Sequence, residues 1–287
     1  MTALHILAES FSSPSELLAA VSSRPCNLLG SVCRSSHAID GEHIKKAKTA
    51  TFDAALAIAR AGYPDGVRAM RDACGKGATA CSSLVEQVKR SRRWSVSGES
   101  VSVARALSGA PRCFCRTRRE SVPAPGLRLV FDGAVSWGVS PASIIAAGGR
   151  MVALVDALRM AGVAVSLAVG WTGYDGERRG GEGFACSVDI ARAGESVPLA
   201  LMAYWCAHPS AWRRIVWSWM ETVPGMESKA WRCGYGFPGR CGCAKRDGVA
   251  DDLSAALLGG AAGRVLGVED LASDDDVPRL FRELTGA

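Results

Sequence analysis

The sequence predicts an α/β protein built on a three-layer, mostly parallel sheet with an antiparallel hairpin at its edge, preceded by a small helical region. Two observations support this fold class. Residues 127–170 read as strand, helix and strand within the length of one βαβ crossover, which places two parallel strands in one sheet with a right-handed connection. A further apolar run at 184–190 follows a polar, glycine-rich loop with no helix between, and this arrangement is typical of an antiparallel pair.

Clear boundary signals surround the βαβ unit. The apolar run at 127–131 stops at Asp132, where the first strand should end. Ser140 and Pro141 then form an N-cap followed by proline at the first helical position, a strong signal for a helix start. Apolar side chains recur at helical spacing until a glycine ends the helix, and 163–169 reads as the second strand.

The remaining elements divide the chain into three regions. Residues 1–85 read as helices, residues 86–125 as a basic connector with a short hairpin around Gly98, and residues 126–287 as the α/β domain. In the first region Ser13, Pro14 and Glu16 resemble a capping box at a helix start. Beyond the βαβ unit and the hairpin strand, we expect helices at 198–206, 209–221, 251–260 and 276–284, and a short strand at 264–268.

Charge is unevenly distributed along the 287 residues, whose formal net charge is +6. Residues 1–125 carry 18 Lys and Arg against 10 Asp and Glu, a balance of +8, whereas residues 248–287 carry 3 against 8, a balance of −5. A basic half is compatible with polyanion binding, although charge alone names no partner. The start of the chain lacks the pattern of a signal peptide, and no segment has the ~18 uncharged apolar residues that a membrane span needs. We therefore expect a protein of the reducing cytoplasm that does not act at a membrane.

Asp132 lies at the carboxyl end of the first predicted strand of the βαβ unit, where open α/β sheets usually bind ligands. The order strand, helix, strand, hairpin strand and helices resembles the von Willebrand factor A fold, one of the Rossmann-like architectures. That resemblance implies an Asp-x-Ser-x-Ser motif for a divalent cation at this position. Here the sequence is Asp132-x-Ala134-x-Ser136, which lacks the middle hydroxyl. Asp132 and Ser136 are thus candidate metal ligands, together with Asp175, and the alternative is a loop aspartate that caps its own turn.

The eleven cysteines offer a second candidate metal site. Cys233, Cys241 and Cys243 lie in a glycine-rich stretch and could contribute ligands to zinc. Their Cys-x-Cys spacing is tighter than that of the usual zinc knuckle, so free thiols are the favoured interpretation. No cofactor is the default expectation, with a divalent cation or zinc as the alternatives.

The basic connector is a candidate nucleic-acid site, because Arg and Lys neutralise phosphates and aromatic rings stack on unpaired bases. No recognised DNA- or RNA-binding signature is present, and a solvated linker is the simpler interpretation. The candidate residues are Lys89, Arg90, Arg92, Arg93, Trp94, Arg116, Arg118 and Arg119.

The sequence contains no phosphate-binding glycine loop and no Gly-x-Ser-x-Gly elbow, and His208 is the one histidine of the predicted α/β domain. We interpret His208 as a residue that satisfies a buried hydrogen bond. We expect a non-enzymatic binding protein with an unidentified protein partner. The alternatives are a nucleic-acid-binding protein that uses residues 89–119 and a metal-dependent enzyme built around Asp132.

Three motifs between residues 92 and 223 resemble an uncharacterised family encoded mainly by tailed bacteriophages and prophages. They are a Gly-x-x-Val-x-Val element ahead of Gly-x-Pro, a Leu-Val-Asp-Ala-Leu helix ending in Ala-Gly, and the junction His-Pro-Ser-Ala-Trp-Arg-Arg at 208–214. The resemblance implies a phage-encoded accessory protein that works in the bacterial host cytoplasm. It implies no particular activity.

Overall fold

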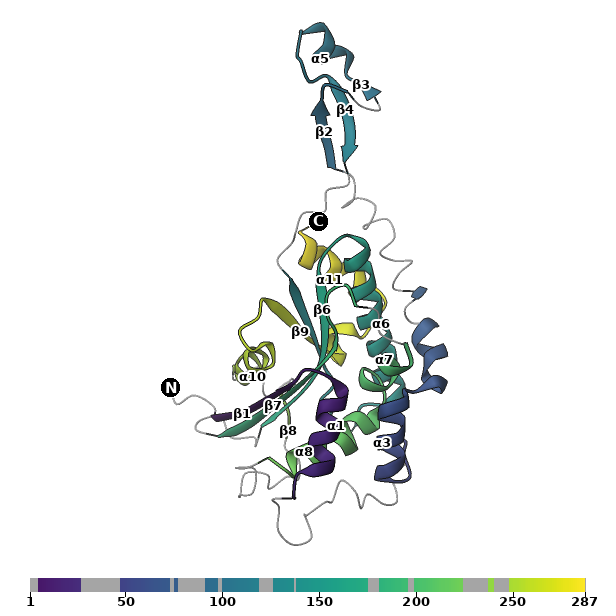
Figure 1. The fold of residues 1–287 in the computed structure, drawn as a ribbon, viewed down its shortest axis with the longest axis vertical. Coiled ribbons are helices and arrows are strands. Elements are labelled where there is room, and N and C mark those ends of the chain that lie inside the picture. The colour runs from purple at the N-terminus through teal and green to yellow at the C-terminus, as the bar shows by residue number, and fades with distance from the viewer. Residues whose placement is uncertain are drawn as a thin grey trace.

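The computed structural model contains a central sheet covered by helices and a smaller sheet that lies apart from it (Figure 1). It describes residues 5–26, 47–72, 75–76, 91–97, 100–118, 126–136, 138–174, 181–195, 199–223, 237–239 and 248–286.

The central sheet has the strand order β1-β7-β6-β5-β9. Strands β5 (Leu127–Asp132), β6 (Val165–Tyr174) and β9 (Gly263–Gly267) run parallel to one another. Strand β7 (Glu182–Ala191) pairs antiparallel with β6, as the glycine-rich loop between them predicts. The short strand β8 (Phe237–Pro238) also pairs with β6, beyond the end of β5. The predicted α/β class with a mostly parallel sheet is confirmed, and β6 and β7 form the predicted antiparallel pair.

The outermost strand β1 (His5–Phe11) was not predicted. It pairs in parallel with β7 from His5 opposite Glu182 to Phe11 opposite Val188, so β7 lies inside the sheet and the predicted hairpin is not its edge. Residues 5–11 fall in the region expected to be helical. A parallel partner about 177 positions away leaves no local pattern, and Glu9 and Ser10 weaken the apolar alternation of a strand.

The crossover helix α6 (Pro141–Met160) joins β5 to β6 as predicted. The hydroxyl of Ser140 accepts a hydrogen bond from the Ser143 amide at 3.1 Å, and Gly162 follows the helix with φ 91°. By length and composition alone this helix could cross a membrane, although it contains Arg150, Asp156 and Arg159. Because 61% of its apolar window is buried inside the protein, α6 has the surroundings of a core helix in a soluble protein.

The sheet is covered on both faces, which gives the predicted three layers (Figure 1). Leu129 and Phe131 of β5 face the larger core, and Val130 between them packs with Leu257 of α10 on the other face. The α10 helix spans Val249–Leu258. The helices that contribute to the larger core are α1 (Pro14–Ser23), α3 (Phe52–Ala61), α6, α7 (Leu199–Trp205), α8 (Trp217–Met220) and α11 (Asp276–Thr285).

Two helix ends differ in detail from their predictions. At the start of α1 the hydroxyl of Ser13 accepts from the Glu16 amide, but the Glu16 carboxylate accepts from the amide of Ser12 rather than that of Ser13. The helix predicted at 209–221 is a π-helix, η2 (Ala211–Val216), that continues into α8. A short 3₁₀ helix, η3 (Val268–Leu271), follows β9.

The smaller sheet contains β2 (Ser91–Ser95), β3 (Ser100–Val101) and β4 (Phe114–Arg118), with helix α5 (Val103–Leu107) between β3 and β4. Its strand order is β2-β4-β3, and both outer strands pair antiparallel with β4. The hairpin predicted around Gly98 is therefore wrong, because β2 and β3 both pair with β4, which follows them in the chain, and not with each other.

Candidate functional site

Asp132 is buried at the carboxyl end of β5 and both of its carboxylate oxygens accept hydrogen bonds. The Ala134 amide donates to Oδ1 at 3.0 Å, and the Thr172 hydroxyl donates to Oδ2 at 2.5 Å. A side chain at Gly239 would come within 2.5 Å of the Thr172 hydroxyl oxygen, so the chain after β8 closes over this pair. The bond from Ala134 matches the alternative in which the aspartate caps its own turn.

Ser136, the other candidate ligand from this motif, is exposed, and its hydroxyl oxygen lies 3.5 Å from the Gly138 amide. The described ranges contain no group of three or more His, Cys, Asp and Glu side chains that could hold a metal. Asp175, Cys233, Cys241 and Cys243 lie outside the described residues. A cation at Asp132 and Ser136, and zinc at the cysteines, therefore stay predictions.

Little space is left beside the strand ends on the α6 side. A cavity of about 10 Å³ lies there between Gly133, Trp171, Trp205 and the junction at residues 206–213. A volume of this size holds about one water molecule. Beside Gly133 and Trp171 the described residues therefore leave room for about one water molecule.

His208 belongs to a buried polar cluster in this junction. Its Nδ1 lies 2.9 Å from the Ser210 hydroxyl, which in turn lies 3.1 Å from the Tyr204 hydroxyl. Burial, helped by the charge of Lys48, lowers the pKa of His208 to about 4, so the ring is neutral at pH 7. Burial also raises the pKa of Tyr204. The cluster therefore has the properties of a satisfied core network, as we interpreted His208 from the sequence.

Two arginines of the π-helix η2 are buried next to this cluster. Arg214 donates to the hydroxyl and carbonyl oxygens of Thr49 and to the carbonyl oxygen of Ala50, at 2.9 to 3.1 Å, and so fixes the segment that leads into α3. Burial lowers the pKa of Arg213 to about 10, which still leaves it charged at neutral pH. The Arg-Arg pair of the junction thus has a structural function at Arg214.

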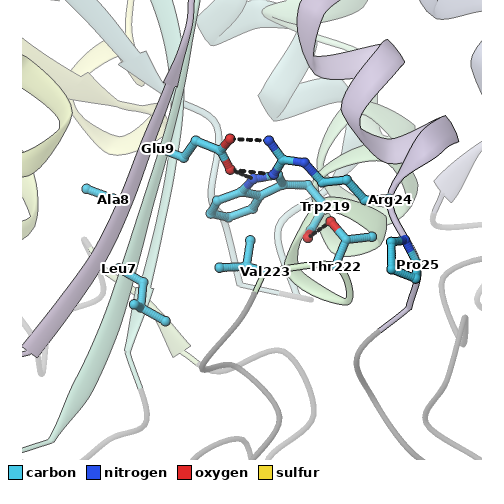
Figure 2. A pocket seen from close by; sticks show the side chains of 8 residues that line it. All are labelled: Leu7, Ala8, Glu9, Arg24, Pro25, Trp219, Thr222 and Val223. Carbon is cyan, nitrogen blue, oxygen red and sulfur yellow. Dashed lines mark hydrogen bonds and ion pairs between the residues drawn. The ribbon is translucent and has the colours of Figure 1, made fainter.

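A pocket of about 500 Å³ opens at the edge of the sheet, between β1, the end of α1 and the end of α8 (Figure 2). Its volume is in the range of sites that hold small molecules or peptide side chains. We call it the β1 pocket. It is lined by Leu7, Ala8, Glu9, Arg24, Pro25, Trp219, Thr222 and Val223.

The polar part of the β1 pocket is an ion pair between Glu9 and Arg24. The two guanidinium nitrogens donate to the two carboxylate oxygens at 2.8 and 2.5 Å, and the indole nitrogen of Trp219 donates to Glu9 Oε2 at 2.6 Å. The bonds from Arg24 hold the pKa of Glu9 below its usual range against the opposing effect of burial. Both side chains are about one third exposed, so the pair is within reach of a ligand.

The apolar part of the β1 pocket lies to one side of the ion pair. In Figure 2, Leu7, Val223 and Pro25 lie below the Glu9–Arg24 pair, with the Trp219 ring next to it. Trp219 is buried and packs against Phe184 of β7 with ring centres 6.0 Å apart, so the indole has a fixed position. The arrangement offers an apolar wall that ends at a fixed pair of charges.

Sequence reasoning missed the β1 pocket because β1 itself was not predicted. Arg24 follows a predicted helix and Trp219 lies in another, about 195 residues later, and only the parallel pairing of β1 with β7 brings both to Glu9.

Five of the eight predicted nucleic-acid residues lie in the smaller sheet. Arg92, Arg93 and Trp94 lie on β2, and Arg116 and Arg118 lie on β4. The register places Arg93 opposite Arg116 and Ser91 opposite Arg118. Lys89, Arg90 and Arg119 lie outside the described residues.

Comparison with known proteins identifies a family for this chain. A family model described as a domain of unknown function (DUF7192) matches residues 3–262, which include β1, the smaller sheet and the βαβ unit. No curated protein and no solved structure shows significant similarity to the chain. Since the matched residues make up most of the sequence, the chain belongs to the DUF7192 family of domains of unknown function.

Proposed function

We propose that this chain is a non-enzymatic binding module that takes an extended peptide along the outer edge of β1. The observation that carries the proposal is the β1 pocket, which is open and about 500 Å³ in volume, whereas the cavity beside the strand ends holds about one water molecule. Enzymes with open α/β sheets usually bind their substrates at the strand ends. The larger space at the sheet edge favours binding there.

The β1 pocket is lined by three consecutive residues of the strand. Leu7, Ala8 and Glu9 are consecutive and all three line it, although successive side chains of a strand point to opposite faces. A pocket that contacts three consecutive residues therefore extends along the edge. Within the described residues β1 pairs with β7 alone, so alternate backbone groups of β1 point away from the sheet. An added strand would hydrogen-bond to these groups.

The lining residues indicate what kind of peptide fits. Leu7, Pro25 and Val223 suit an apolar side chain, and the guanidinium of Arg24 suits an acidic or polar side chain nearby. The balance of +8 over residues 1–125 favours an acidic peptide over a basic one through long-range attraction. We therefore propose a peptide in which apolar and acidic residues alternate.

Two further proposals concern context. The strand order β7-β6-β5-β9, with β7 antiparallel, supports the von Willebrand factor A-like topology proposed from the element order. The resemblance of residues 92–223 to proteins of tailed phages supports a role as a phage accessory protein in the bacterial cytoplasm.

A peptide library tests the function directly. Fluorescently labelled peptides of about ten residues, enough for one added strand, would alternate apolar residues with acidic, basic or neutral polar ones. We expect the acidic set to bind best, and we expect binding to slow hydrogen exchange of the β1 amides. Leu7→Lys should raise the dissociation constant at least about tenfold by placing a charge against the apolar wall.

Met160→Lys is the matched control, because Met160 is exposed at the far end of α6. It should change the dissociation constant less than about twofold. Peptides that bind the Leu7→Lys protein equally well, or that leave exchange at β1 unchanged, would show that the edge is not the binding site.

A further inference from the structure

We propose that the smaller sheet binds duplex DNA, with the ribbon of β2 and β4 lying in the major groove. We call residues 91–118 the arm. In Figure 1 the arm lies apart from the central sheet, and its two main strands form a short antiparallel ribbon. The major groove of B-DNA is wide enough for such a two-stranded ribbon. This proposal is independent of peptide binding at β1.

The arm concentrates positive charge. Residues 91–118 contain six arginines and one acidic residue, a balance of +5, whereas the whole chain carries +6. Phosphate neutralisation by arginine and lysine supplies most of the affinity of proteins for nucleic acid. The six arginines are Arg92, Arg93, Arg105, Arg112, Arg116 and Arg118.

The strand register places two of these arginines directly opposite each other. Arg93 lies directly opposite Arg116 in the register of the β2–β4 pair, and Arg118 follows two positions later on β4, opposite Ser91. Like charges in directly opposite positions destabilise a sheet. A polyanion beside the ribbon would reduce the repulsion between the two arginines. This register is therefore more favourable with a phosphate backbone bound than in solvent alone.

The arm also exposes apolar side chains. Five large hydrophobic residues are strongly exposed in the described part of the chain, and the arm holds four of them, with exposed fractions between 49% and 84%. They are Val96, Val101, Val103 and Leu107. Proteins that bind DNA grooves use apolar side chains to contact thymine methyl groups or to wedge between base steps. Exposed apolar residues in a segment that also carries six arginines therefore fit a duplex that is held by its phosphates and contacted at its bases.

Fluorescence anisotropy with a labelled duplex of about 20 base pairs, two helical turns, tests the proposal on the full chain. We expect binding that weakens steeply as salt rises. The double variant Arg93→Gln/Arg116→Gln should weaken binding at least about tenfold near 100 mM salt and reduce the slope of log affinity against log salt by about 2. The same substitutions remove the like-charge pair, so unfolding measurements should show an arm that is at least as stable as before.

The control is Arg68→Gln/Arg71→Gln, which removes the same charge from exposed positions of the main body and should change affinity less than about twofold. A second variant, Val101→Ser/Leu107→Ser, should lower affinity several-fold and leave the salt slope unchanged. The proposal is overturned if Arg93→Gln/Arg116→Gln and Arg68→Gln/Arg71→Gln lose equal DNA affinity. It is also overturned if the affinity of the wild-type protein for the duplex does not depend on salt. Tighter binding to the single strand, or to vesicles with phosphatidylserine, would also overturn it.

Discussion

Arg24 is joined to Glu9 by two hydrogen bonds of 2.8 and 2.5 Å, and this pair ties the end of α1 to the outermost strand of the sheet. The backbone amide of Arg24 also caps α1 by donating to the Ala20 carbonyl. Trp219 adds a third bond to the same carboxylate from α8. A single glutamate therefore joins the strand edge to two helices, and the shape of the β1 pocket depends on it.

Arg24→Met should destabilise the protein by about 1 kcal/mol at pH 7, the upper part of the range for a partly exposed ion pair. Arg24 holds the pKa of Glu9 below its usual value of 4.5. The folded state therefore binds a proton less readily than the unfolded chain, so this stabilisation is complete above pH 4.5 and is lost as pH falls through the lower folded pKa. Urea unfolding at pH 7 and at pH 3 should show a difference between the two proteins that shrinks in acid.

Arg264→Met is the matched control for this measurement, because Arg264 forms a more exposed pair with Glu283 on the protein surface. It should change the unfolding free energy by less than about 0.5 kcal/mol. Equal effects of the two substitutions on the unfolding free energy would show that the Glu9–Arg24 pair stabilises the protein no more than a surface ion pair does.

Thr172→Val should destabilise the protein by about 1 to 3 kcal/mol, since it leaves the buried Oδ2 of Asp132 without its short bond. Ser136→Ala removes an exposed hydroxyl, which lies three positions after Gly133 and two after Ala134. This substitution should change the free energy of unfolding by less than about 0.5 kcal/mol. Thermal unfolding of both proteins with and without Mg²⁺ checks this. A stabilisation by Mg²⁺ that disappears in both variants would instead support the predicted cation site.

His208→Gln should make stability less sensitive to acid. The folded pKa of about 4 lies below the ordinary value of 6.5, so the unfolded chain takes up the proton first. The wild-type protein then loses stability as pH falls from 6.5 to 4, by on the order of 3 kcal/mol from this group. Urea unfolding across that range should give a shallower pH dependence for the variant than for the wild-type protein, and equal slopes would contradict a buried, neutral His208.

The parts of the fold that were predictable have local signals. The cap at Ser140, the proline at 141 and the glycine at 162 delimit α6 through contacts within a few residues. β1 has no such signal, because its place is decided by pairing with β7 and by the core beneath it. The pairing of β2 and β3 with β4 was missed for the same reason.

The site was less predictable than the fold. Asp132 could be placed at a strand end from the sequence, and its bond to Ala134 follows from local geometry. Its bond to Thr172 depends on the lateral register of β5 and β6, which the sequence does not specify to one residue. Glu9, Arg24 and Trp219 come from three separate elements, so the β1 pocket exists only in the folded chain.

Gly148→Ala should destabilise the protein although alanine is the better helix former. In a free helix the change would add about 1 kcal/mol of stability. Here a Cβ at position 148 would lie 2.6 Å from the Cys206 carbonyl oxygen, because α6 packs closely against the chain that leads to His208. A backbone carbonyl cannot move away as a flexible side chain can, so the added Cβ should overpack this site. The loss of about 1 to 3 kcal/mol of unfolding free energy should exceed the gain in helix propensity. The control is Gly75→Ala, where no atom lies within 4 Å of the added carbon. Urea unfolding of both variants separates the cost of overpacking from the gain in helix propensity. A stabilised Gly148→Ala protein would contradict the close packing of α6 on the junction.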